Sequence, residues 1–221
     1  MSIPKKHTIT CPKCGTSGDF TAWDSINVDL MPEMKEKVMS GEIFRWTCPH
    51  CGETFTVPYP ILYHDMSKQI MVYHLLQRGN PSDMKAVNIL GKNGLMANYT
   101  LRCAYSIDDF REKIAQLESG LDDRVLEMLK YYFLHHNPQS ELPEDAVLRF
   151  DRAAENKETG ETVLLFFLIH PSYPKQPYIQ VPSFAYHEME KTGNLDAIFG
   201  SQDTDYIEVS QDYIRNVLER K

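Results

Sequence analysis

Residues 11–15 read Cys-Pro-Lys-Cys-Gly, and residues 48–52 read Cys-Pro-His-Cys-Gly. Two residues between a pair of cysteines let both sulfur atoms face one ion, and the proline fixes the backbone angle of the turn. The glycine that follows can take the left-handed conformation that reverses the chain. Two such turns supply four thiolates for a tetrahedral site. The sequence therefore predicts one structural zinc ion bound by Cys11, Cys14, Cys48 and Cys51.

Iron and redox chemistry are the alternatives to zinc at these cysteines. Iron is bound by similar turns in rubredoxin, so the cysteines alone leave both metals open. Cys-Pro-His-Cys also occurs in disulfide oxidoreductases, where a helix N-terminus lowers the thiol pKa. Here both motifs run into strand-like segments, and a redox site leaves the duplication unexplained. His50 lies between two ligands and is expected on the surface, not as a fifth ligand.

The segments around the cysteines predict a zinc ribbon with an inserted helix. Short strands are expected at residues 7–10, 19–23, 44–47 and 54–57. Between the two motifs, Pro32 and Gly41 mark the start and end of a helix, which explains the spacer of 33 residues. The β-branched and aromatic residues of 70–75 favour a hairpin with residues 62–65.

Composition divides the chain in two. Four of the five cysteines and both tryptophans lie in the first 76 residues, and turn signals follow between residues 77 and 98. The fold class expected is α+β, with the ribbon module joined to a mixed α+β domain. The predicted domains are the zinc-ribbon-like module 1–76, a linker 77–98 and an α+β domain 99–221.

Helices are expected first in the second domain, and strands after them. A strand at 100–105 precedes a helix that Ser106 caps and Gly120 ends. The apolar stripe of the next helix consists of Leu121, Val125, Met128, Leu129 and Tyr132. Strands are predicted at residues 146–152, 162–169, 178–181, 185–188 and 206–209, the first two forming a hairpin. Ser210 caps a final helix.

Charge and hydropathy argue against several classes of partner and location. The formal net charge is -8, and the first 66 residues hold six basic and eight acidic side chains, so neither nucleic acid nor membrane is expected as a partner. No apolar run approaches a membrane span, and the polar N-terminus lacks a signal peptide core. A cytoplasmic location is expected, where thiols stay reduced and serve as metal ligands.

With its paired motifs, the chain resembles the CpXC proteins, a bacterial and archaeal group named for them. The resemblance covers the first 75 or so residues well, in the stretches 23–28, 32–37, 44–52 and 59–66. It extends more loosely to residues 120–127, Gly-Leu-Asp-Asp-Arg-Val-Leu-Glu. The resemblance implies metal binding by the four cysteines and implies no activity.

Outside the cysteines, His64 and Asp65 form the most prominent polar cluster. A histidine beside a carboxylate can perform general acid–base catalysis or bind a catalytic metal. The simpler interpretation is a structural joint, where the chain leaves the ribbon and enters a hairpin, and we adopt it because no nucleophile has an identifiable partnership with the pair. Cys103 is expected to be a small buried apolar residue.

The functional prediction is a zinc-binding protein that recognises another protein, with the ribbon as a rigid presenting surface. An enzyme with its site in the C-terminal domain or around His64 and Asp65 is the first alternative. A nucleic-acid-binding zinc ribbon is the second alternative. The sequence identifies neither the partner nor the oligomeric state.

Overall fold

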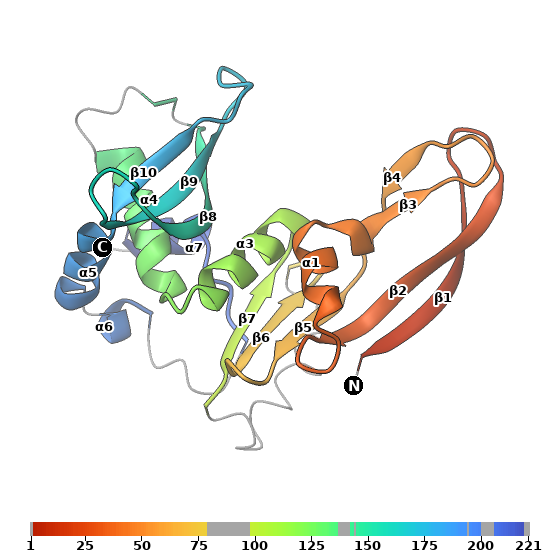
Figure 1. Cartoon of the computed structure of the whole chain (residues 1–221), viewed down its shortest axis with the longest axis horizontal. Coiled ribbons are helices and arrows are strands. Elements are labelled where there is room, and N and C mark those ends of the chain that lie inside the picture. The colour runs from red at the N-terminus through yellow and green to blue at the C-terminus, as the bar shows by residue number, and fades with distance from the viewer. Residues whose placement is uncertain are drawn as a thin grey trace. The chain divides into compact units, whose positions relative to one another are not determined.

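The computed structural model describes residues 2–78, 98–136, 142–143, 145–193, 195–199 and 206–218 of the 221-residue chain. The chain forms two compact units. Unit 1 comprises Met1–Arg111 with Thr204–Ile207, and unit 2 comprises Glu112–Asp203 with Glu208–Lys221. Most of the predicted linker lies outside the described residues. The α+β fold class is confirmed by mixed helices and sheets in the described part (Figure 1).

Unit 1 is built on a five-stranded sheet with strand order β1-β2-β5-β6-β7. The strands are β1 (Ile3–Thr10), β2 (Ser17–Asn27), β5 (Ile61–Asp65), β6 (Ile70–His74) and β7 (Thr100–Ala104). The pairs β2-β5 and β6-β7 are parallel, and β1-β2 and β5-β6 are antiparallel. The antiparallel register of β5 and β6 confirms the hairpin predicted from its β-branched and aromatic residues.

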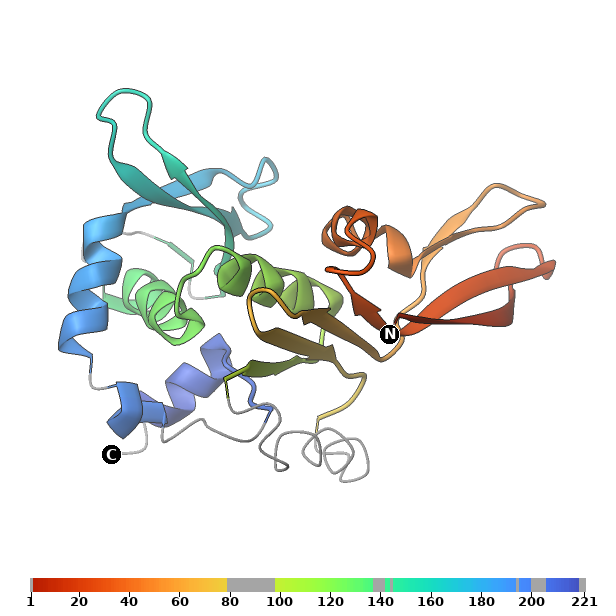
Figure 2. The same ribbon diagram turned by 60° about the horizontal axis from the view of Figure 1, so that its bottom comes forward.

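A second hairpin completes the ribbon, which we define as β1, β2, β3 (Arg45–Thr47) and β4 (Thr54–Thr56). In Figure 1 and in the turned view of Figure 2, the turns of the two hairpins lie side by side. The inserted helix is α1 (Glu33–Met39), followed by the short 3-10 helix η1 (Glu42–Phe44). Helix α1 buries Met34 and Val38, and the chain reverses after it at Gly41, whose φ is 71°.

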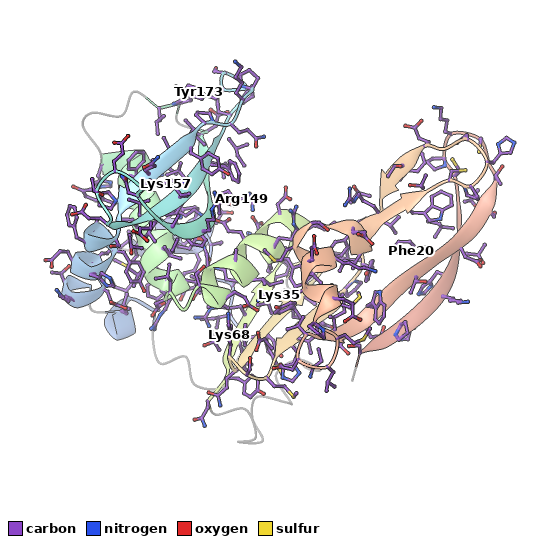
Figure 3. All side chains as sticks on the ribbon, viewed as in Figure 1. Phe20, Lys35, Lys68, Arg149, Lys157 and Tyr173 are labelled. Atoms are coloured by element: carbon purple, nitrogen blue, oxygen red, sulfur yellow. The ribbon has the colours of Figure 1, made fainter. Side chains whose placement is uncertain are left out.

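The core of unit 1 joins the ribbon to the sheet. Phe20 of β2, labelled in Figure 3, packs its ring 5.7 Å from that of Tyr59. The Tyr59 ring lies 5.1 Å from the ring of Phe44, which is fully buried. These aromatic contacts pack strand β2 of the sheet against the base of the β3-β4 hairpin.

Strand β7 belongs to the sheet of unit 1, whereas the predicted division placed it in the C-terminal domain. It pairs in parallel with β6, and its residues Leu101 and Cys103 are buried in a cluster with Met71, Leu75 and Tyr206. A parallel partner is reached through a long connection and leaves no hairpin signal in the local sequence. Of the strand predicted at 206–209, the structure retains a single parallel bridge from Ile207 to Arg102.

Unit 2 contains an antiparallel sheet with strand order β10-β9-β8. Its elements are α4 (Asp123–His136), β8 (Val147–Glu155), β9 (Thr162–Ile169), β10 (Tyr178–Pro182), α5 (Ser183–Thr192), α6 (Leu195–Phe199) and α7 (Gln211–Leu218). Helix α3 (Ile107–Glu118) begins in unit 1 and continues into unit 2. The predicted β8-β9 hairpin is confirmed, and Ser210 caps α7 by accepting the Tyr213 amide at 3.2 Å.

Two predictions for unit 2 are wrong. The strand expected at 185–188 is part of helix α5, in which Tyr186 is buried while His187 and Glu188 are exposed. One buried position between exposed neighbours fits a helix that rests one face on the core. The predicted stripe of α4 includes Tyr132, which is 54% exposed, so the buried face of that helix differs from the prediction. Within the described residues, no helix is long and apolar enough to span a membrane.

Candidate metal centre

Two turns with the same backbone geometry present the four cysteines. In each knuckle, the amide of the first cysteine donates to the carbonyl five residues later, and the amide of the glycine donates to the first cysteine's carbonyl. These bonds are Cys11 to Thr16 (2.9 Å), Gly15 to Cys11 (2.9 Å), Cys48 to Glu53 (2.8 Å) and Gly52 to Cys48 (3.0 Å). Gly15 has a φ of 74° and Gly52 one of 72°, the left-handed conformation that the sequence predicted.

The sulfur atoms converge from the two hairpins. All four Sγ atoms lie within 4.8 Å of one another. Between the knuckles, Sγ of Cys11 lies 3.7 Å from Sγ of Cys51, and Sγ of Cys14 lies 3.6 Å from Sγ of Cys48. A zinc–sulfur distance of about 2.3 Å places the vertices of a regular tetrahedron about 3.8 Å apart. The donor set and its spacing therefore fit one tetrahedral metal ion.

Contacts between the hairpins hold this geometry. The indole Nε1 of Trp46 in β3 donates to the carbonyl of Asp19 in β2 at 3.0 Å. Lys13 of the first knuckle forms an ion pair with Glu53 of the second. A Cβ atom at Gly18 would lie 3.0 Å from the Trp46 ring, so only glycine allows this close approach without a shift.

The thiols of Cys14 and Cys51 differ in acidity because their surroundings differ. Hydrogen bonds from the side chain and backbone of Thr16 lower the pKa of Cys14 to about 5. The Glu53 amide also favours the thiolate of Cys51, but desolvation and the three neighbouring sulfurs raise its pKa to about 12. Four adjacent thiolates repel one another, and a bound divalent cation removes that repulsion.

The surroundings of the cysteines do not fit a disulfide oxidoreductase. None of the five cysteines forms a disulfide, and the knuckles lead into the strands β2 and β4 rather than into a helix. A reactive thiol pair of that class needs a helix N-terminus or an equivalent positive field. The cluster is a possible metal site, and its donors suit both zinc and iron.

His64 and Asp65 make structural contacts at the place where the joint was predicted. The Oδ1 of Asp65 accepts the hydroxyl of Ser67 at 2.7 Å and the amide of Lys68 at 2.8 Å, so it caps the turn between β5 and β6. The His64 ring lies 3.4 Å from the amide nitrogen of Asn27 in β2 and 3.2 Å from the Tyr99 hydroxyl. Burial lowers the pKa of His64 and favours the neutral ring.

Removing either side chain is expected to lower stability without changing metal content. For Asp65→Ala and His64→Ala we expect a loss of about 1–3 kcal/mol in the free energy of unfolding, because the buried Asp65 carboxylate no longer caps its turn and the buried Asn27 loses its contact with His64. Chemical denaturation and elemental analysis measure both quantities. Asp24→Ala is the control, since the Asp24–Lys5 ion pair is about half exposed and contributes little. Unchanged stability in both test variants would contradict the structural role.

Sequence reasoning did not single out His74. This residue ends β6, is only 1% exposed, and lines a cavity of unit 1. Its signal in the sequence, a histidine inside an apolar strand, is the same as that of an ordinary core histidine. Only the cavity beside the ring distinguishes it.

Comparison with known proteins identifies one family. The family model described as CpXC protein matches residues 9–130, which include both knuckles, α1 and the His64–Asp65 segment. Searches of curated proteins and of solved structures found no match.

Proposed function

Given that the chain belongs to the CpXC protein family, we propose that it holds one structural zinc ion and recognises another protein through its ribbon. The observation that carries the proposal is the convergence of four sulfur atoms at tetrahedral spacing from the tips of two hairpins. Zinc is favoured over iron because closed four-cysteine sites of this geometry are its usual structural sites. We also propose a cytoplasmic location, because cysteines without disulfides suit a reducing compartment.

The coordination set supports a structural role for the ion. Four thiolates fill the coordination sphere, so no position is left for a water molecule that the ion would activate. When bound, the ion joins the tips of the β1-β2 and β3-β4 hairpins, and the second hairpin has only short strands. Strands β3 and β4 pair over three residues each, which is too little for a hairpin to be stable by itself.

Exposed side chains on a rigid frame support recognition. Pro12, Lys13, Pro49 and His50 are exposed at the knuckle tips, while Cys11 and Cys48 are buried. Loops fixed by a scaffold bind partners at low entropic cost, because little freedom is lost on binding. The module has more acidic than basic residues, which favours a protein over a nucleic acid as the partner.

The test captures partners with the full chain and compares His50→Ala with the parent protein. We expect about tenfold weaker binding of a genuine partner, corresponding to about 1.4 kcal/mol, with unchanged zinc content. His187→Ala is the matched control, because His187 is an exposed histidine in unit 2. Binding is measured by calorimetry on the purified pair.

Two outcomes would contradict the recognition proposal. In the first, the partner binds the metal-free protein as tightly as it binds the metal-loaded protein. Such binding would not depend on the folded ribbon. Micromolar, salt-sensitive binding to random duplex or single-stranded DNA at physiological salt would instead favour the nucleic-acid alternative.

A further inference from the structure

Unit 1 contains a cavity of about 580 Å³. Its lining comes from the base of the β3-β4 hairpin, the end of β6 and the first turns of α3, and all of these residues belong to unit 1. Pockets for small molecules and cofactors commonly have volumes of about 300–1,000 Å³. The volume is therefore large enough for a small metabolite, and the metal centre does not account for it.

His74 places a hydrogen-bond acceptor in this lining. Its Nδ1 lies 2.7 Å from the carbonyl oxygen of Tyr59, and because that oxygen only accepts, Nδ1 carries the hydrogen. Burial lowers the pKa of His74, so the ring is neutral at neutral pH and its Nε2 has a bare lone pair. The rings of Phe44 and Phe110, at 5.6 Å and 5.7 Å, fix the orientation of the imidazole.

Nε2 of His74 has no hydrogen-bond partner among the residues that the structure describes. A neutral imidazole nitrogen without a hydrogen is an acceptor, and a ligand that donates a hydrogen bond to Nε2 would use this lone pair. The acceptor thus specifies one feature of the ligand, a hydroxyl or an N–H group.

Two arginines supply positive charge to the same cavity. Nε of Arg111 donates to the carbonyl of Met39 at 2.6 Å, and Arg45 donates to the carbonyl of Ser40 at 3.5 Å. The end of helix α1 therefore holds both guanidinium groups, each of which has five N–H donors in total. Asp108 also lines the cavity, 3.5 Å from Arg111, but its side chain is 64% exposed.

Apolar side chains complete the lining. Leu76 is 49% exposed although it is a large apolar residue, and Pro58 and Ile107 line the cavity with it. Contact with a carbon skeleton would remove this surface from water. The lining thus combines an acceptor, two cations and an apolar wall, a composition typical of sites that orient a small polar metabolite.

We propose that this cavity binds a small hydroxylated organic anion. Its carboxylate or phosphate contacts Arg45 and Arg111, and its hydroxyl donates to Nε2 of His74. Guanidinium groups bind both kinds of anion in a bidentate manner, so the shared chemistry is a compact oxyanion next to a hydroxyl group. This binding site is independent of the metal and goes beyond the recognition function proposed above.

The experiment titrates the full metal-loaded chain with glycolate and with glycerol phosphate and follows the imidazole signals of His74 by NMR. We expect saturable shifts in the millimolar range with at least one of these probes, and the stronger probe identifies the oxyanion. Acetate and inorganic phosphate lack the alcohol hydroxyl, and each should bind about tenfold more weakly than its hydroxylated counterpart. Glycerol lacks the charge and should produce no saturable shift.

Two variants separate the contribution of Arg45 to anion binding from that of His74 to hydroxyl recognition. Arg45→Gln changes an exposed residue and should lower the affinity for the better anion at least tenfold while the amide spectrum stays native. His74→Asn keeps a donor towards the Tyr59 carbonyl and removes Nε2, so it should abolish the preference for the hydroxylated anion. The proposal is overturned if neither hydroxylated anion gives saturable shifts, or if Arg45→Gln binds them as tightly as the parent protein.

Discussion

Replacing Cys48 with serine is expected to abolish metal binding and to unfold the ribbon. The parent protein should contain about one zinc ion per chain, and the variant should contain none after purification. Structural zinc sites contribute about 10–16 kcal/mol of apparent binding free energy at pH 7, as much as the whole stability of a typical small domain. Elemental analysis measures the metal, and amide hydrogen exchange over residues 3–56 measures the ribbon.

The fifth cysteine provides a matched control. Cys103 lies on β7, is 2% exposed, and is not part of the four-sulfur cluster. Cys103→Ser should keep the full metal content even if the buried hydroxyl lowers stability. If freshly purified parent protein contains iron, the identity of the metal is corrected and the cysteine site stands. If metal-stripped protein keeps the amide protection of its ribbon, the ion is not structural and the prediction is wrong.

The second large effect is expected at Lys130, in a buried network of charges in unit 2. Its Nζ lies 2.8 Å from Glu112 and 3.0 Å from Glu127, and the lysine is 3% exposed. Lys130→Met should cost about 3–5 kcal/mol, because two buried carboxylates lose the nearest of their counter-charges. Denaturant unfolding of the full chain, followed by a probe in unit 2, measures the loss.

The network of buried charges explains why Lys130→Met should lower stability strongly. Lys113 pairs with Asp123 at 2.9 Å, and Arg149 of β8 donates to Glu112 at 3.2 Å. With Lys130 and Glu127, the group contains three cations and three carboxylates, so the charges balance. Burial lowers the pKa of Lys130, but the two carboxylates raise it above its ordinary value. Burial raises the pKa of Glu112, the carboxyl that takes up a proton first when a cation is lost.

An exposed lysine tests whether burial is the cause. Lys191 pairs with Glu188 at the same helical spacing as Lys130 with Glu127, but both side chains of this pair are mostly exposed, so Lys191→Met should cost less than about 1 kcal/mol. The Lys130→Met penalty should shrink as the pH falls toward 4.5, since a carboxyl with a raised folded-state pKa is less unfavourable once protonated. Equal losses at the two lysines would contradict this account.

Local sequence was sufficient to predict the structure wherever the backbone geometry depends on one short segment. The Cys-Pro-x-Cys-Gly repeats identified both knuckles, and the left-handed glycines and the matching backbone hydrogen bonds follow from those five positions. The helix between Pro32 and Gly41 and the hairpin of β5 and β6 were recognisable for the same reason. In each case, backbone geometry and periodicity act over a few residues, within the range that a sequence pattern reports.

The tertiary structure alone decided which polar residues are buried. The pattern of α4 indicated Tyr132 on its inner face, yet Tyr132 is exposed, while Glu127 and Lys130 are buried. A second face of α4 is covered because α3 contributes Glu112 and Lys113, and α7 contributes Gln211, whose Nε2 donates to Glu127 at 2.6 Å.

His74 was likewise unrecognisable until the fold placed it in the lining of one cavity with Arg45 and Arg111 from distant segments. The sequence by itself identified the four clustered cysteines and the turns that hold them, since the contacts that shape each turn are local within its knuckle. The buried charges and the cavity depend on contacts between residues far apart in the chain. Charge compensation and cavity shape are properties of the packed elements, and no single segment contains them.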